Sequence, residues 1–149
     1  MKRMLALVLL ASLAAGCSHT RECHCRAYQK KYRRPLTGTA WQLVQLYGQN
    51  VQSEKGAFTV TLSPEEGRIS GSGACNRLSG DYATDETRAL KIGPLRTTRM
   101  ACPRLEQEQK FVEALTTTTH YDMDGPMLML LCDGELRAVL QAVPEPNEK

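Results

Sequence analysis

Two histidines and two cysteines lie within seven residues near the start of the chain. They are His19, Cys23, His24 and Cys25. Imidazole and thiolate groups are ligands that suit copper or zinc, so this cluster could bind a metal ion. The Cys-X-Cys spacing nevertheless lacks the second pair of ligands at a defined distance that structural zinc sites have. We therefore expect no resident metal or other cofactor, and keep metal binding by these four residues as an alternative.

Cys17 is a candidate for lipid attachment. It follows a basic start, Met1-Lys2-Arg3, and twelve apolar or small residues from Met4 to Ala15, which is the layout of a secretory signal. A membrane-spanning helix needs roughly 20 apolar residues, so this run is too short to be a permanent anchor. The sequence Leu13-Ala14-Ala15-Gly16-Cys17 resembles the bacterial lipobox, which implies cleavage before the cysteine and its acylation. By resemblance to enteric lipoproteins, Ser18 implies an outer-membrane location facing the periplasm; the alternative is a soluble secreted protein.

Charge divides the rest of the chain into a basic segment and an acidic one. Six basic residues and one acidic residue occur in 18–36, whereas eleven basic and fifteen acidic residues follow from Thr37 onward. We predict a signal peptide at 1–16, a lipidated cysteine and basic tether at 17–36, a folded domain at 37–143 and a disordered tail at 144–149. The tether is either attracted to anionic lipid head groups or simply solvated. An acidic domain in the cell envelope makes nucleic acid an unsuitable partner.

Hydrophobic patterning predicts the elements of the folded domain. Strands are expected at 39–47, 58–62, 68–70, 89–95, 127–132 and 136–143, with Asp133-Gly134 as a hairpin turn. Glycines at 71, 73 and 80 indicate a bent or bulged strand and a tight turn. A helix is expected at 103–116, since Pro103 suits the first helical position and Leu105, Val112 and Leu115 share one side. The predicted fold class is α+β, mainly β: a strongly curved antiparallel sheet or small barrel covered by a single helix.

Three stretches, in this order, resemble the META domain family of HslJ-like, heat-inducible bacterial lipoproteins. They are Gly38–Leu43, Ile69–Tyr82 and Thr97–Pro103, and the resemblance spans roughly 37–143. The residues that carry the family pattern are Trp41, Gly73, Asn76, Arg99 and Glu108. This resemblance implies an antiparallel β domain wrapped on one helix, no established enzymatic activity, and a role in envelope stress. The Cys23-His24-Cys25 segment and Cys132 depart from the family pattern.

Five cysteines remain after Cys17, which is an odd number for an oxidising compartment. The resemblance favours a disulfide between Cys75 and Cys102, because both lie in family elements. The alternative is that both are buried and reduced, since cysteine is a common small core residue. At least one of Cys23, Cys25 and Cys132 must then stay free or pair outside the monomer.

Glu108 falls inside the apolar side of the predicted helix, where a carboxylate needs a partner. We expect an ion pair with Arg99 or Arg77, each of which lies in a family element. The functional alternative is that these groups and Asn76 line a groove for a small ligand or a partner.

The sequence offers little for catalysis, since His120 is the only histidine of the domain and no Gly-X-Ser-X-Gly elbow occurs. It predicts a non-enzymatic outer-membrane lipoprotein that binds an envelope protein or supports envelope stress tolerance. The alternatives are a periplasmic metal-binding lipoprotein that uses the His/Cys segment, and an inhibitor that presents a loop to a hydrolase.

Overall fold

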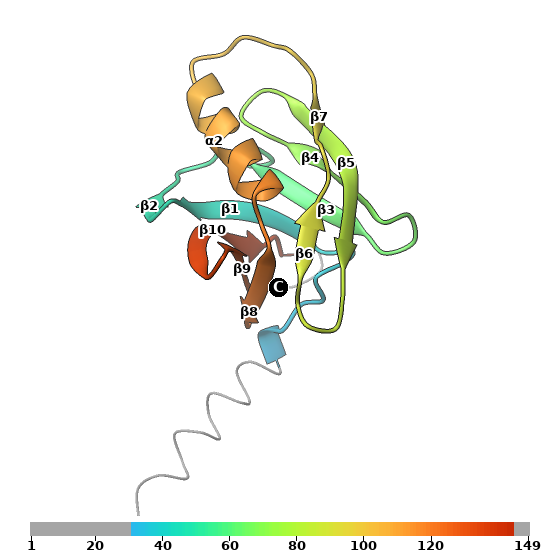
Figure 1. Ribbon diagram of the computed structural model, residues 1–149. Helices are drawn as coiled ribbons and strands as arrows, with labels where there is room; N and C mark the ends of the chain where they lie inside the picture. The colour runs from blue at the N-terminus through green and yellow to red at the C-terminus, as the bar shows by residue number, and fades with distance from the viewer. Residues whose placement is uncertain (1–30, 145–149) are drawn as a thin grey trace, which may run out of the picture.

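The computed structural model describes residues 31–144 (Figure 1). The predicted signal peptide, the lipidation candidate Cys17, the cluster of His19, Cys23, His24 and Cys25, and residues 145–149 of the predicted tail lie outside the described residues. Within 31–144, none of the helices has the length and apolar character needed to cross a membrane.

Antiparallel strands and one helix make up the domain, as the patterning predicts. The strands are β1 (Ala40–Leu46), β2 (Gln49–Asn50), β3 (Thr59–Ser63), β4 (Arg68–Ser72), β5 (Arg77–Thr84), β6 (Leu90–Ile92), β7 (Arg96–Thr97), β8 (His120–Asp124), β9 (Met127–Cys132) and β10 (Glu135–Ala142), and the helix is α2 (Leu105–Thr116). Residues 31 and 32 are also helical. The sheet runs in the order β6-β5-β4-β3-β1-β10-β9-β8, while β2 pairs with β1 and β7 with β5.

The two ends of this sheet meet and nearly close it into a barrel. An antiparallel bridge joins Ala89, just before β6, to His120 of β8. Around it, the Leu90 amide donates to the Thr119 carbonyl at 2.9 Å, and the Tyr121 amide donates to the Arg88 carbonyl at 3.0 Å. The predicted fold class, a curved antiparallel sheet or small barrel with a single covering helix, is therefore confirmed.

The core lies between the concave side of the sheet and α2, which packs against β1, β6 and β10 (Figure 1). Alternation along the strands buries every second residue, as in β3, where Val60 and Leu62 face inward. From the helix, Phe111, Ala114 and Leu115 enter the same core. The ring of Phe111 meets that of Phe58 edge to face with centroids 5.6 Å apart. These contacts fix the position of the helix on the sheet.

The start of the helix, strand β8 and the start of the domain differ from the sequence prediction. The helix begins at Leu105 and not at Pro103, because 103–104 form a turn in which the Leu105 amide donates to the Cys102 carbonyl at 3.2 Å. The strand β8 was not predicted as a strand. Leu36, assigned to the tether, is buried in the core, and its carbonyl accepts a hydrogen bond from the Trp41 indole at 2.9 Å.

Candidate functional site

The carboxylate of Glu108 lies at the junction of α2 with the turn between β4 and β5. Its side chain is 4% exposed, and its oxygen Oε2 accepts hydrogen bonds from the backbone amides of Cys75 at 2.9 Å and Asn76 at 3.0 Å. The other oxygen, Oε1, accepts from the Asn76 side-chain amide at 2.6 Å. Both oxygens of a buried charge are therefore satisfied by donors from a single turn.

Asn76 connects this carboxylate to the segment that precedes the helix. Its side-chain nitrogen also donates to the Met100 carbonyl at 3.1 Å. Its oxygen Oδ1 accepts from the Met100 amide at 2.7 Å and from the Thr98 hydroxyl at 2.8 Å. A primary amide has two donor hydrogens and two acceptor lone pairs, and all four are used here. Asn76 thus fixes the backbone on both sides of Met100.

Gly73 makes room for the Glu108 carboxylate. A Cβ atom at this position would lie 2.5 Å from the Glu108 Oε2 atom, closer than real Cβ contacts occur. The Gly73 amide also donates to the Asn76 carbonyl at 2.7 Å, which closes the turn that presents the donors. The glycine signal in the sequence therefore marks a close approach of backbone to a side chain.

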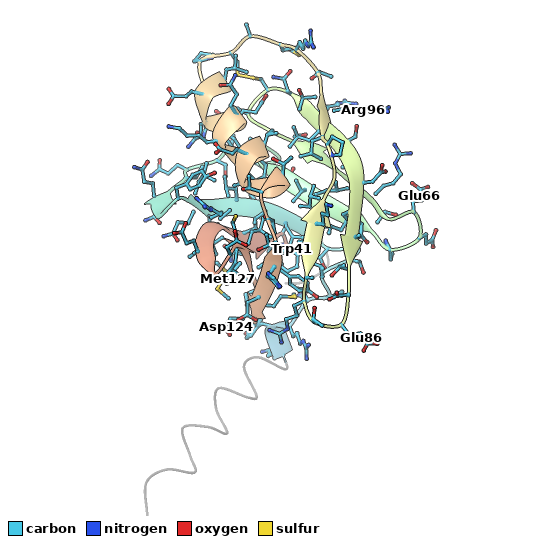
Figure 2. The ribbon with its side chains drawn as sticks, viewed as in Figure 1. Trp41, Glu66, Glu86, Arg96, Asp124 and Met127 are labelled. Atoms are coloured by element: carbon cyan, nitrogen blue, oxygen red, sulfur yellow. A yellow bond between two sulfur atoms is a disulfide. The ribbon has the colours of Figure 1, made fainter. Side chains whose placement is uncertain are left out.

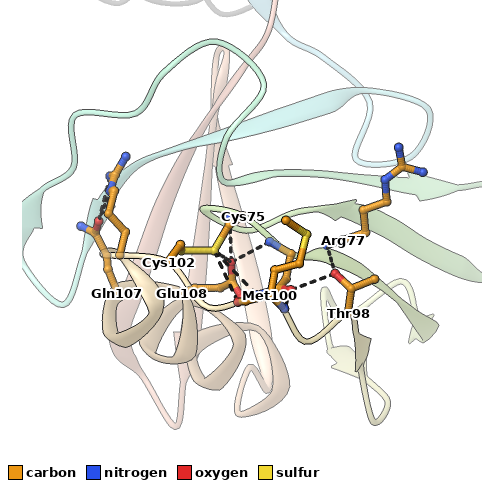
Figure 3. Close-up of a disulfide and its surroundings, with 9 residues drawn as sticks. Cys75, Arg77, Thr98, Met100, Cys102, Gln107 and Glu108 are labelled. Carbon is orange, nitrogen blue, oxygen red and sulfur yellow. Dashed lines mark hydrogen bonds between the residues drawn. A yellow bond between two sulfur atoms is a disulfide. The ribbon is translucent and has the colours of Figure 1, made fainter.

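A disulfide joins Cys75 to Cys102, with Cα atoms 6.5 Å apart (Figure 3). The pairing that the family resemblance favoured is thus present. The disulfide links the turn that binds Glu108 to Cys102, which lies between Met100 and the start of α2. We call Gly73, Cys75, Asn76, Cys102 and Glu108 together the clamp, and 98–101 the clamped loop.

Glu108 is ionised in this setting. Burial alone raises the pKa of a carboxyl group, but the hydrogen bonds that Glu108 accepts from Cys75, Asn76 and Ala74 outweigh it, so its pKa lies below the ordinary value of 4.5. Glu108 also lies in the first turn of α2, where the helix dipole favours negative charge. Backbone and side-chain amides, and not a cation, stabilise this charge.

The predicted ion pair of Glu108 with Arg99 or Arg77 is wrong. Within the described residues, neither arginine forms an ion pair with the carboxylate, and both are exposed. Figure 3 shows the Arg77 side chain pointing away from Glu108. The physical reason is that amide donors from the turn already stabilise the charge of the carboxylate, so it needs no guanidinium.

The clamped loop forms one wall of a groove whose volume is about 440 Å³. Leu105, Gln109 and Val112 of α2 form the facing wall, and Asn76 and Glu108 line its floor. Met100 also lines the groove and, at 61% exposed, is the most exposed large hydrophobic side chain in residues 31–144. Arg99 also lines the groove. Arg99, Asn76 and Glu108 therefore line a groove and Arg77 does not, while Asn76 and Glu108 use their polar groups in hydrogen bonds to each other and to the clamped loop.

Sequence reasoning did not single out Thr98 and Met100. Both stand in the Thr97–Pro103 stretch, so the family resemblance contains them, but nothing in their types marks them. The Thr98 hydroxyl also accepts a hydrogen bond from the backbone amide of Arg77 at 3.1 Å, which attaches the clamped loop to β5. Their roles depend on distant partners, and only the folded chain brings those together.

Other predicted residues lie away from the clamp. Trp41 is fully buried, and its indole donates a hydrogen bond to the Leu36 carbonyl. It therefore holds the segment before β1 against the domain. Cys132 ends β9 and is the only free cysteine among the described residues. His120 is exposed on β8, next to the Thr119 hydroxyl. Across residues 31–144, no three His, Cys, Asp or Glu side chains gather in a way that could hold a metal ion.

The fold and the clamp define a class of protein: a small barrel-like β domain that packs against one helix and holds an exposed loop in a fixed shape. Residues 34–144 match the META domain, and the chain belongs to the META domain family. This family has no established enzymatic activity. No curated protein matches the chain significantly.

Solved structures share the fold. An NMR structure of a protein from Burkholderia xenovorans is 30% identical, with a TM-score of 0.57 over 80% of this chain and 88% of that one. A second protein solved by NMR is 28% identical, with a TM-score of 0.57 over 71% of this chain and 90% of that one. A crystal structure of a DUF4847 family protein from Bacteroides vulgatus is 18% identical, with a TM-score of 0.57 over 76% of this chain and 96% of that one. The last likeness concerns the fold alone.

Proposed function

We propose that this META-family protein is a non-enzymatic outer-membrane lipoprotein that faces the periplasm and supports the envelope by binding another envelope protein. The lipobox-like sequence that ends at Cys17 supports the anchor, and the domain supplies the binding surface. The anchor has a direct test: Cys17→Ser abolishes labelling of the protein by radioactive palmitate. Palmitate labelling that persists in this variant contradicts the anchor.

The clamped loop is the observation that carries the binding function. Asn76 holds the backbone of Met100 on both sides, and the Cys75–Cys102 disulfide holds the segment where it joins the helix. The side chain of Met100 nevertheless faces solvent at the rim of the groove. Binding to a loop that is already ordered costs less conformational entropy, and methionine adapts to varied apolar partners. The clamp thus presents an apolar contact in a fixed position.

A photo-crosslinking amino acid tests this surface in living cells. Placed at Met100, it gives a discrete crosslinked band that contains one partner protein. Placed at Thr87, an exposed turn residue on another part of the domain, it gives no such band. Met100→Asp, combined with a crosslinker at Arg99, removes the band because a carboxylate cannot enter an apolar partner site. Equal crosslinking from positions 100 and 87 contradicts the proposed surface.

Inhibition of a hydrolase is a second candidate function, and the same rigid loop favours it. An inhibitor that presents a loop to an enzyme gains affinity when the loop is preorganised, and a disulfide is a common way to achieve this. The crosslinking experiment separates the two functions. A hydrolase whose activity falls on addition of the full-length protein supports inhibition, whereas a partner without hydrolytic activity supports the first function alone.

A further inference from the structure

The outer face of the sheet beside the clamp carries ordered rows of hydroxyl groups that end in arginines. Strand pairing aligns Thr61, Ser70, Ser79 and Arg96 across β3, β4, β5 and β7. The next row aligns Thr59 with Ser72 and Ser72 with Arg77. Because side chains at every second position share a face, both rows point away from the core. The register therefore builds one polar platform from four strands.

This platform is hollowed into a groove with a volume of about 630 Å³, lined by Ser70, Ser72, Ser79, Arg77 and Arg96 among others. Arg96 lies opposite Ser79, so it is a diagonal neighbour of Arg77, within reach of a long side chain. Neither guanidinium makes an ion pair or a side-chain hydrogen bond with any residue in 31–144. Two exposed guanidinium groups without a protein partner in 31–144 thus end neighbouring rows of hydroxyls, in a domain that has more acidic than basic residues.

We propose that this groove binds a bacterial cell-wall glycan strand whose attached peptides carry carboxylates. Guanidinium groups bind carboxylates with two parallel hydrogen bonds, and serine and threonine hydroxyls donate to and accept from sugar hydroxyls. Hydroxyls repeated across strands fit a polymer with many hydroxyls better than a single small ion. The inference goes beyond the protein-binding surface at Met100 and rests on the proposed envelope location; Thr97 and Thr98 line both grooves.

Acidic residues beside the platform exclude ligands with dense negative charge. Asp81 lies on the same face of β5, two residues from Ser79, and it pairs in register with Arg68. Glu65 and Glu66 are exposed in the turn between β3 and β4, and Figure 2 shows Glu66 on the same side of the molecule as Arg96. A membrane surface crowded with phosphates would meet these carboxylates as well as the arginines. A glycan whose carboxylates are widely spaced can reach Arg77 and Arg96 and avoid them.

Cosedimentation with purified peptidoglycan sacculi tests the proposal, with the full-length lipidated protein held in detergent micelles. The wild-type protein sediments with the sacculi, and Arg77→Gln/Arg96→Gln weakens binding about tenfold or more, since charge-assisted hydrogen bonds are lost. Lys55→Gln/Lys91→Gln removes the same charge from exposed sites outside the groove and changes binding less than twofold. Sacculi whose carboxylates have been converted to amides bind the wild type as weakly as native sacculi bind the arginine variant.

Several outcomes overturn the proposal. One is wild-type sedimentation of the arginine variant, and another is an equal loss in the lysine control, which would indicate net charge alone. A third is displacement by inorganic phosphate as effective as that by soluble peptidoglycan fragments at equal ionic strength, which indicates a general anion site. Thermal unfolding confirms that each variant is folded, and Arg96→Gln alone, in the short strand β7, serves if the double variant is not. Met100→Asp keeps its binding to sacculi, so failure here is distinct from failure of the protein-binding surface.

Discussion

The clamp and the β9–β10 hairpin hold together by different means. In the hairpin, strands adjacent in sequence pair along their length, and Leu128, Leu130, Ala138 and Leu140 bury their side chains side by side. Its turn has Asp133 at φ 50° and Gly134 at φ 86°, the conformation that Asp-Gly favours between twisted strands. In the clamp, Glu108 meets donors 32 and 33 residues away through three hydrogen bonds.

This difference separates replaceable contacts from irreplaceable ones. Many apolar contacts share the stability of the hairpin, so a side chain of similar volume can substitute for another. The clamp has few polar atoms, and several of them bind two partners, so the loss of one acceptor leaves buried donors unsatisfied. We therefore expect conservative substitutions to cost little in the hairpin and much in the clamp, and the clamped loop to change shape when they are made in the clamp.

Removing the disulfide has the largest expected effect. The bridge spans a sequence separation of 27, and closing a loop of this length lowers the entropy of the unfolded chain by an amount worth about 3.5 kcal/mol. Cys75→Ser/Cys102→Ser should lower the free energy of unfolding in urea by about that much. Cys132→Ser in the hairpin is the matched control, with a change below about 1 kcal/mol. Equal effects of the two changes would remove the distinction between the regions.

Glu108→Gln is expected to have the next largest effect, about 2 to 3 kcal/mol. The amide keeps the volume of the carboxyl group but replaces one acceptor oxygen with a donor, which then faces the donors of Cys75 and Asn76. Leu140→Met is the corresponding volume-conserving change in the hairpin and should cost less than about 1.5 kcal/mol. Urea unfolding of both variants measures the contrast, and a larger loss for Leu140→Met would reverse it.

Much of the hairpin was predictable from the sequence, whereas most of the clamp was not. The apolar run 127–132 and Asp133-Gly134 are local signals, and β9 has the predicted bounds. The disulfide was predicted from the family resemblance. From the charge of Glu108 we predicted an arginine as its partner, and this prediction is wrong. Backbone amides take that place, and because they are present at every position they carry no sequence signal. The same reason hides Thr98 and Met100, whose contacts with Asn76 form only when β5 and the helix are in place.

The pH dependence of stability gives a smaller effect that belongs to the clamp alone. The folded-state pKa of Glu108 lies below the ordinary 4.5, so its charge contributes stability above that pH. This contribution is lost as the pH falls through the folded-state pKa. The difference in unfolding free energy between wild type and Glu108→Gln should therefore be constant from pH 7 to about 5 and narrow below about 4. A difference that stays constant down to pH 3 would show that the clamp does not depend on the carboxylate charge.

Removal of the tether should have the smallest effect on the free energy of unfolding, provided that the deletion leaves Leu36 in place. We expect the domain to be stable without its tether, and the sequence prediction places the boundary between the two after Leu36. Leu36 is 8% exposed and packs in the core, and Trp41 donates to its carbonyl, so the domain includes it. Leu36→Ala should therefore destabilise the protein by about 2 kcal/mol or more, as other core truncations do.

Deletion of 18–34 keeps Leu36 and Pro35, whose carbonyl accepts a hydrogen bond from the Thr39 hydroxyl at 2.7 Å. This deletion removes all six basic residues of the tether. It should change the free energy of unfolding by no more than about 0.5 kcal/mol, the range of surface changes, with or without a chelator. The clamp and the hairpin would then both be independent of the tether. A loss of several kcal/mol would mean that the segment with His19, Cys23, His24 and Cys25 docks on the domain or binds a metal there, and would favour the metal-binding alternative.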